Sequence, residues 1–494
     1  MQLKVKLLKW SAGIPVAMLN HKTAGKMGVH PQDRINIRTL SKNPKEVTTI
    51  IDVVKGIVKE GEVAISSELE KYMNYHLGKN VEVNLAIPPQ SLDFVKKKLN
   101  NKELSKNEIK LIVKDVMNNS LSDAEIAIFI IGIHKYGMNM KEMIYLTESI
   151  RDTGSELHFK QKFVVDKHSI GGIPGNRTTP LVVSICSAAG LTMPKNSSRA
   201  ITSAAGTADV METIADVEFT VKQLYEIIKK VNACIVWGGG LGMTPADAKL
   251  MEVERSLRID PEPQMIASIM SKKLAAGSKY ILIDIPCGKN AKISDIKKAK
   301  RLKNKFEALG KHFRKNLKCV ITDGNQPIGN GIGPTLELMD IVKILDPAQK
   351  GPQDLEKKAL FLAGNIFEMT GKAKKGKGTK LAKEMLLSGK AFDKFKDIIK
   401  AQNGNLNRLK IAKFKHDIHS KKKGTIIEID NHLVNSLVRV AGCPVDKPAG
   451  IYLHFHVGDR IQKRQKIVTI YAESKSRLDE AVKLYEKSKP IKLK

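Results

Sequence analysis

Residues 164–212, which read VVDKHSIGGIPGNRTTPLVVSICSAAGLTMPKNSSRAITSAAGTADVME, are the most informative stretch of the chain. An apolar, strand-like start leads into a glycine-rich loop, and an apolar run at helical spacing over 181–189 follows. A second loop of small residues then occupies 197–207. Loops rich in Gly, Ser and Thr that each lead into a helix can direct backbone N–H groups and hydroxyls at an anion. Because Lys167 adds a point charge suited to phosphate, the stretch predicts a site that holds phosphate beside a second, small polar ligand.

The order of these motifs is more specific than either loop alone, because glycine pairs also mark ordinary turns. DKHSIGG at 166–172, a helix rich in small residues, and SSRAITSAAGTAD at 197–209 together resemble the thymidine/pyrimidine-nucleoside phosphorylase family. The motifs KHSIGGIPGN and SSRAITSAAGTAD are typical of the archaeal AMP phosphorylase branch of this family. The resemblance extends over nearly the whole chain. Neither a Rossmann fingerprint nor a Walker P-loop motif occurs.

The pattern along the chain predicts an α/β multidomain protein in four segments. Alternating apolar and polar residues over 1–84 indicate a small β-rich N-terminal module, and helical periodicity over 85–160 indicates a helical domain. Strands that alternate with helices predict a mixed α/β catalytic, phosphate-binding domain over 161–340. Residues 341–494 are expected to form an α+β C-terminal module that is first helical and then β-rich.

Local signals refine this division. Ser105 and Ser122 each precede a helical pattern and are expected N-caps. The β-rich end resembles the family's hammerhead-like module, but Arg464 and Gln465 stand where the tight turn of that module commonly has glycine. The resemblance also implies that the helical domain pairs two subunits, so we expect a homo-oligomer, a dimer or larger.

Net charge is the most unusual bulk property, since 84 Lys and Arg against 51 Asp and Glu give +33 in 494 residues. Such a balance makes a nucleic-acid-binding protein on a related fold the rival hypothesis. The basic residues are mixed with acids, however, only 5% of residues are aromatic, and zinc-finger, RRM and basic-zipper motifs are absent. We expect a solvated, lysine-rich surface that steers anionic substrates, without specific nucleic-acid recognition.

The sequence contains no apolar run long enough to span a membrane, and its first residues interleave lysine with apolar positions, unlike a signal peptide. The five cysteines are scattered and lack CxxC spacing, which is typical of reduced core thiols. We therefore expect a cytoplasmic protein that interacts with no membrane. The cysteines are Cys186, Cys234, Cys287, Cys319 and Cys443.

Phosphorolysis of an N-glycoside is the chemistry that the resemblance implies. Inorganic phosphate attacks the anomeric carbon, and a positioned proton donor that neutralises the departing base can contribute about 10²–10⁴-fold. This reaction requires neither a metal nor a redox cofactor, and the chain has no HExxH motif or cysteine cluster. We expect neither a cofactor nor a metal site.

Asp260 is the expected general acid, because the matching aspartate of the AMP phosphorylase branch is the proposed proton donor. It directly precedes Pro261, a context that favours extended or turn backbone. A carboxyl in that role needs burial or nearby negative charge to keep its proton near neutral pH. The alternative is a turn or N-cap aspartate without a chemical role. His168 is expected to line the site and is the next candidate donor.

Two residues of the following helix, Ser268 and Lys272, are four positions apart and share a face. In the pyrimidine-nucleoside phosphorylases, a Ser and a Lys of the same SIMSKK motif bind the base of the substrate. An arginine that also contacts the pyrimidine there is replaced by Val253 in this register. This departure favours the AMP phosphorylase branch.

The remaining contacts are implied by the resemblance, position by position. Gly172 allows close backbone approach, and Lys292 stands where this branch has a nucleotide-contacting lysine. The expected phosphate-binding residues are Lys167, Ser169 and Ser197. The second loop is expected to present hydroxyls and amides to the nucleotide through Ser198, Arg199, Ala200, Ile201, Thr202, Ser203 and Thr207.

The preferred hypothesis is a glycosyltransferase of nucleotide catabolism, a nucleoside 5′-monophosphate phosphorylase. AMP and phosphate would give adenine and ribose 1,5-bisphosphate, with CMP and UMP as further candidate substrates. The N-terminal module, PGN in the first loop and SSRAITS in the second favour this reading. The alternatives are a thymidine or pyrimidine-nucleoside phosphorylase and a nucleic-acid-binding protein.

Overall fold

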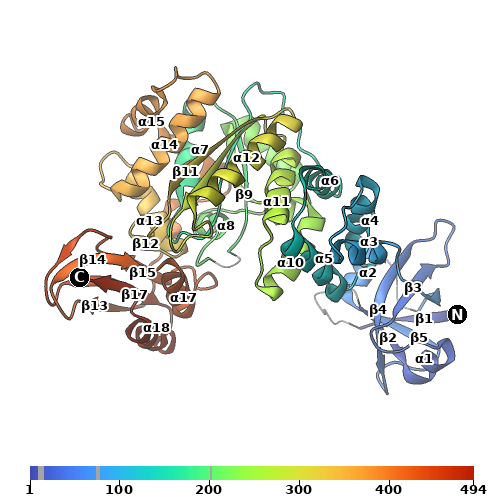
Figure 1. The fold of residues 1–494 in the computed structure, drawn as a ribbon. Coiled ribbons are helices and arrows are strands. Elements are labelled where there is room, and N and C mark those ends of the chain that lie inside the picture. Colours follow the sequence, from blue (N-terminus) through green and yellow to red (C-terminus); the bar gives the residue numbers. More distant parts are fainter. Residues whose placement is uncertain (9–15, 74–77, 201–202) are drawn as a thin grey trace. The chain divides into compact units, whose positions relative to one another are not determined.

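The chain forms two compact units, whose elements are drawn in Figure 1. Sheets and helices occur in both units, which confirms the predicted α/β multidomain class. The expected borders near residues 84, 160 and 340 stay predictions. The computed structural model describes residues 1–8, 16–73, 78–200 and 203–494. Unit 1 comprises Met1–Gly154 and Thr244–Ser271, and unit 2 comprises Ser155–Met243 and Lys272–Lys494.

Unit 1 begins with a closed barrel of six strands in the order β1-β5-β2-β4-β3-β6. The period-two pattern of the sequence gives this barrel its core, since Leu3, Val5, Ile35 and Ile37 are buried while their neighbours face outward. Closure pairs the edges that an open sheet would expose. The strands are β1 (Gln2–Leu7), β2 (Val16–Asn20), β3 (Arg34–Thr39), β4 (Glu46–Val54), β5 (Glu62–Ile65) and β6 (Asn80–Leu85), with helices α1 (His21–Met27) and α2 (Ser67–Met73).

Helices form the rest of unit 1. Ser105 and Ser122 are N-caps in complete capping boxes with Glu108 and Glu125, which confirms both expected helix starts. Helix α10 comes from a later part of the chain and packs against α4 and α5. The helices are α3 (Ser91–Leu99), α4 (Lys106–Met117), α5 (Asp123–Tyr136), α6 (Met140–Arg151) and α10 (Pro245–Leu257).

Unit 2 is built on parallel strands. β11, β10 and β7 pair in that order, β8 pairs with β9, and a parallel bridge between Val164 and Thr192 joins the two groups. The chain moves outward from β7 to β9 and then returns to the other side of β7. Ligands bind at such a reversal in open α/β sheets, outside the carboxyl ends of the strands. The strands are β7 (Val165–Ser169), β8 (Met193–Ser197), β9 (Ala233–Trp237), β10 (Tyr280–Cys287) and β11 (Asn316–Asp323).

The helix predicted from the apolar run is α7 (Thr178–Ala188), and it is buried from Thr178 to Ser187. It packs against α14 and α16, so the main hydrophobic core lies around it. A helix that is apolar on every side is expected to be buried in this way. The other helices of this region are α8 (Thr207–Met211), α9 (Val221–Val231), α12 (Ile296–His312), α13 (Pro334–Leu345), α14 (Gln353–Met369), α15 (Gly378–Leu387) and α16 (Lys390–Ala401), with 3₁₀ turns at Gly238–Leu241 and Leu406–Arg408. Helix α11 (Glu262–Ala275) begins in unit 1, and only its residues after Ser271 belong to unit 2.

The β-rich end of the chain consists of two antiparallel sheets and two helices, and its residues from 414 onward are drawn in orange to red-brown in Figure 1. Its turn between β16 and β17 is retained with Arg464 in the left-handed conformation, φ 65°, that glycine adopts most readily. The elements are β12 (Gly331–Ile332), β13 (Phe414–His419), β14 (Gly424–Ile429), α17 (Asn431–Ala441), β15 (Gly450–Leu453), β16 (Arg460–Ile461), β17 (Lys466–Ala472), α18 (Lys475–Ser488) and β18 (Ile491–Leu493).

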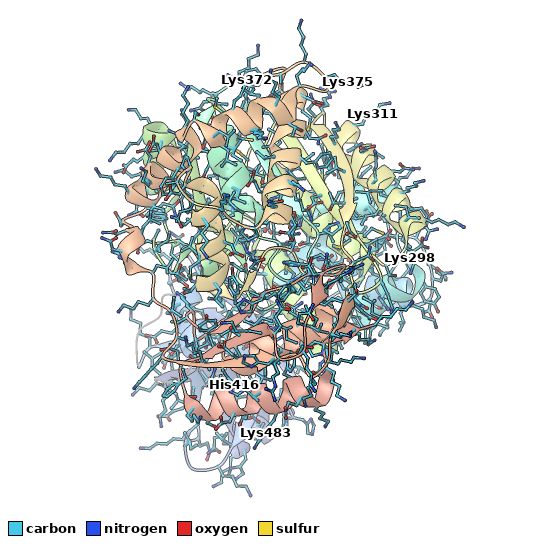
Figure 2. All side chains as sticks on the ribbon, turned by 90° about the vertical axis from the view of Figure 1, so that its left-hand side faces the viewer. Lys298, Lys311, Lys372, Lys375, His416 and Lys483 are labelled. Carbon is cyan, nitrogen blue, oxygen red and sulfur yellow. The ribbon has the colours of Figure 1, made fainter. Side chains whose placement is uncertain are left out.

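Lysines project outward from several elements of unit 2. Figure 2 shows Lys298 and Lys311 on α12, and Lys372 and Lys375 between α14 and α15, extending from the ribbon. All four side chains are exposed, as a solvated basic surface requires. The five cysteines are free thiols. Among the described helices, none is both long enough and apolar enough to cross a membrane.

Candidate active site

The carboxyl ends of β7 and β10 meet at the reversal of strand order. Ser169, the last residue of β7, lies beside Asp284 in the register of the two strands. Its Oγ donates a 2.7 Å hydrogen bond to the Asp284 carboxylate, which also accepts one of 2.6 Å from Thr322 Oγ1 on β11. Asp284 is fully buried. The expected phosphate residue Ser169 therefore stands where the topology favours ligand binding.

Lys167 is buried beneath the first loop, with 1% of its surface exposed. Its Nζ donates to Thr178 Oγ1 at 2.5 Å and lies 3.5 Å from Thr179 Oγ1, at the start of α7. Burial lowers the pKa of Lys167 to about 7, and the nearby Asp284 carboxylate opposes that shift. The side chain can thus meet an anion only inside the protein, in company with hydroxyl groups.

A second buried ion cluster lies on the other side of β7. Asp166 pairs with Lys273 at 2.8 Å and with Lys195 at 3.1 Å. Burial alone would raise the pKa of Asp166, but the two lysines hold it below its usual value. Partly buried His168 lies near these charges, and burial together with Lys273 and Lys195 keeps its pKa well below the usual range. His168 is therefore neutral at physiological pH in the free protein.

The second loop is held from inside by Asp209 of α8. Its carboxylate accepts hydrogen bonds from the backbone N–H groups of Ala200 (2.7 Å) and Gly206 (2.8 Å). Gly206 must be glycine, because a side chain there would collide with the backbone of Ser198 and Arg199. Ser197 Oγ at the loop's start is buried without a hydrogen-bond partner in the described residues. An unpaired buried hydroxyl is costly, so a ligand oxygen would stabilise it.

The expected nucleotide-binding residues of this loop differ in their surroundings. Ser198 is exposed, and Ser203 Oγ donates to the Ala205 carbonyl at 3.0 Å. Arg199 is bound to carboxylates, at 2.5 Å from Glu212 and 2.9 Å from Glu218, and it stacks on Trp237. These contacts indicate a loop-positioning role for Arg199. Two expected residues, Ile201 and Thr202, lie outside the described residues.

Arg177 ties the two loops together. Its guanidinium donates to Thr207 Oγ1 at 3.0 Å and to the Ala205 carbonyl oxygen at 2.7 Å. Its Nε donates at 2.6 Å to Glu337, whose side chain is 1% exposed. Thr207 is thus placed by a residue that immediately follows the first loop.

Gly172 and Lys292 also come together. Gly172 has φ 108°, and a Cβ on it would lie 3.0 Å from the backbone nitrogen of Lys292, so glycine is required there. The Lys292 side chain is exposed. An open depression of about 750 Å³ lies nearby at the ends of β10 and β11, lined in part by Lys289 and Thr322.

The base-binding and proton-donor candidates lie along α11 and just before it. Asp260 is exposed and precedes the helix by two residues. Ser268 is buried, and Lys272 follows one turn later on the same helix. Asp260 and Ser268 belong to unit 1, whereas both loops belong to unit 2. The roles of these residues stay predictions.

Comparison with known proteins identifies the family. Residues 92–154 match the helical bundle domain of the glycosyl transferase family, and residues 161–392 match the a/b domain of the same family. Residues 425–492 match the pyrimidine nucleoside phosphorylase C-terminal domain. The chain is 41% identical over 497 residues to the AMP phosphorylase of Thermococcus kodakarensis, covering 100% of this chain and 98% of that protein. This chain belongs to the AMP phosphorylase family. Identity is 39% over 492 residues to the AMP phosphorylase of Methanococcus vannielii, with 99% and 97% covered.

A solved structure shows the same fold outside this family. The anthranilate phosphoribosyltransferase of Thermus thermophilus is 18% identical, with a TM-score of 0.53. The match covers 63% of this chain and all of that one. The helical and α/β architecture is therefore shared beyond the AMP phosphorylase family.

In this member of the AMP phosphorylase family, the expected site residues are contacted by four further side chains that were not predicted from the sequence. Thr178 and Thr179 contact Lys167, Asp284 holds Ser169, and Arg177 holds Thr207. The two threonines stand directly after PGNR at a helix start, a signal that could have revealed them. Asp284 and Arg177 carried no such signal, because their partners lie 115 and 30 residues away in the sequence.

Proposed function

We propose that this protein is an AMP phosphorylase, which converts AMP and inorganic phosphate to adenine and ribose 1,5-bisphosphate. The observation that carries the proposal is identity of about 40% to AMP phosphorylases over the full length of the chain. The buried lysine and hydroxyl groups at the end of β7 support it, because they suit an oxyanion.

In the proposed reaction, a phosphate oxygen forms a bond to C1′ of the ribose while the N-glycosidic bond breaks. The electron pair of that bond goes to the adenine, and the Asp260 carboxyl transfers its proton to the base. Asp260 is exposed in the free protein, so this role requires the bound nucleotide to shield its carboxyl from water. Lys167, Ser169 and Ser197 hold the phosphate nucleophile in place. Positioning and proton transfer together account for this type of catalysis without a metal or redox step.

The 5′-phosphate of the nucleotide is assigned to the second loop and to Lys292. Backbone N–H groups, the hydroxyls of Ser198, Ser203 and Thr207, and a lysine are suited to a second phosphate group. Ser268 and Lys272 are assigned to the base. On this basis nucleosides that lack the 5′-phosphate are poor substrates.

A pyrimidine-nucleoside phosphorylase is the second candidate, because the C-terminal residues match that family's domain. Val253, which is buried in α10, stands against it at the position of the pyrimidine-contacting arginine. The deciding experiment measures phosphate-dependent base release from AMP, CMP, UMP, adenosine, thymidine and uridine. Activity on AMP at least about tenfold above adenosine and thymidine is expected, and equal turnover of thymidine would refute the proposal.

The enzyme is further proposed to be cytoplasmic and homo-oligomeric. Free thiols and the proposed nucleotide substrate support the first assignment. The resemblance of the helical domain to a dimerising one supports the second. Light scattering of the purified protein tests it, and a monomer at micromolar concentration would refute it.

A further inference from the structure

Lys358, in the second turn of α14, places a buried cation at the carboxyl edge of the sheet. Its residue surface is 9% exposed, and its Nζ lies 3.2 Å from Asp284 Oδ2. Yet Nζ makes no hydrogen bond with any residue that the structure describes. An ammonium group carries three N–H donors, and burying them unused is costly. The position therefore favours a ligand that accepts hydrogen bonds.

The charges around Asp284 also favour an anionic ligand. Burial would raise the pKa of this carboxyl, but Lys358 and Lys167 hold it low, so it carries one negative charge. Two buried lysines thus share a single carboxylate. Both of its oxygens already accept hydrogen bonds from Ser169 and Thr322. When Lys167 is protonated, the two lysines and the one carboxylate leave a net positive charge that a bound anion would balance.

The geometry defines where that charge belongs. Ser169 Oγ and Lys358 Nζ approach the same carboxylate oxygen, Oδ2, so one small ligand can reach both groups. A plain structural ion pair would not explain the arrangement, since the 3.2 Å approach of Lys358 leaves its N–H groups without hydrogen bonds. A tetrahedral oxyanion provides several acceptor oxygens and the missing charge.

We propose that Lys358 is a further phosphate-binding residue, whose ammonium completes a buried oxyanion site with Lys167 and Ser169 for inorganic phosphate. Its role in catalysis rests on the proposed function. The same chemistry is present in the 5′-phosphate of a nucleotide, so the two sources are separated by experiment. Inorganic phosphate is favoured because Lys167 and Ser169 are the residues that the family resemblance gives to it.

The test compares Lys358→Met, which keeps the length of the side chain and removes its charge, with Lys358→Arg. Exposed Lys357 on the same helix provides the matched control, Lys357→Met. Calorimetry of phosphate binding without nucleotide is the first measurement, and KM values for phosphate and AMP are the second. Lys358→Met should weaken phosphate binding at least about tenfold, whereas Lys358→Arg and Lys357→Met should stay within about threefold. If Lys358→Met does not fold, Lys358→Gln replaces it.

Three results have distinct meanings. Unchanged phosphate binding by folded Lys358→Met would overturn the inference, even if AMP is cleaved. A higher KM for AMP with normal phosphate binding would overturn the assignment to inorganic phosphate in favour of the 5′-phosphate. Wild-type protein that binds phosphate through Lys358 but releases no adenine would refute the proposed function and leave the inference intact.

Discussion

Arg177 donates a 3.0 Å hydrogen bond to Thr207 Oγ1, so the residue that follows the first loop fixes the end of the second. The same guanidinium is anchored on buried Glu337 at 2.6 Å. One cation thus sets the spacing between two loops that are both proposed to contact phosphate groups of the substrates. Loss of this contact should affect stability and substrate binding together.

Arg177→Met should lower the free energy of unfolding by about 3–5 kcal/mol, because it leaves the Glu337 carboxylate buried without its partner. Chemical denaturation measures this change. The double variant Arg177→Met/Glu337→Gln removes the orphaned charge and should recover much of the loss. Equal stability of the single and double variants would mean that the pair has no such role.

Lys167→Met should raise the KM for phosphate about 10–100-fold, since it removes a charge-assisted contact worth about 1.5–3 kcal/mol. Met fills similar volume, so the fold should persist. Steady-state kinetics at saturating AMP measure the effect. A normal phosphate KM and kcat would place Lys167 outside the site.

Sulfate inhibition should weaken as pH rises. Sulfate keeps its double charge across this range, whereas Lys167, with a pKa of about 7 in the free protein, loses its proton above that value. Competition by sulfate against phosphate, measured from pH 6 to about pH 8.5, should therefore show a rising inhibition constant. In Lys167→Met this dependence should be reduced, and an identical profile in both proteins would contradict the assignment.

Asp260→Asn should lower kcat with AMP by about 10²–10⁴-fold, because asparagine cannot transfer a proton to the base. KM should change far less, since the lost interaction belongs to the transition state. Single-turnover adenine release measures the chemical step. If kcat stays near that of the wild type, the donor lies elsewhere, and His168→Gln becomes the next variant to test.

The stabilisation that Glu212 provides at neutral pH should be lost at low pH. Hydrogen bonds from Arg199 and Lys447 lower the pKa of Glu212 to about 2 from a usual 4.5. Because the folded-state pKa is depressed, its contribution is present above about pH 4.5 and is lost as pH falls towards 2. Melting temperatures over this window should fall less steeply in Glu212→Gln than in the wild type. Exposed Glu226→Gln is the control and should follow the wild type.

Much of the architecture could be read from local patterns. The N-caps Ser105 and Ser122, the buried helix after the first loop and the alternation of the N-terminal strands all depend on residues close in sequence. Arg464 shows that the presence of glycine is not required for this turn, because Arg464 itself adopts the left-handed conformation that glycine usually provides. The left-handed conformation is costly for a residue with a side chain, but packing of the surrounding structure can maintain it.

The family and the two loops could be recognised from the amino-acid sequence, and Asp260 could be proposed as the proton donor, because each lies in a contiguous motif of the chain. The electrostatics of the site, in contrast, depend on residues that are far apart in the sequence and meet only in the folded chain. Ser169 meets Asp284 across 115 residues, and Arg177 meets Glu337 across 160. Whether a lysine such as Lys167 or Lys358 is a surface charge or a buried cation in need of an anion depends on what surrounds it. Burial and long-range pairing set that cost, and neither property is encoded in local spacing.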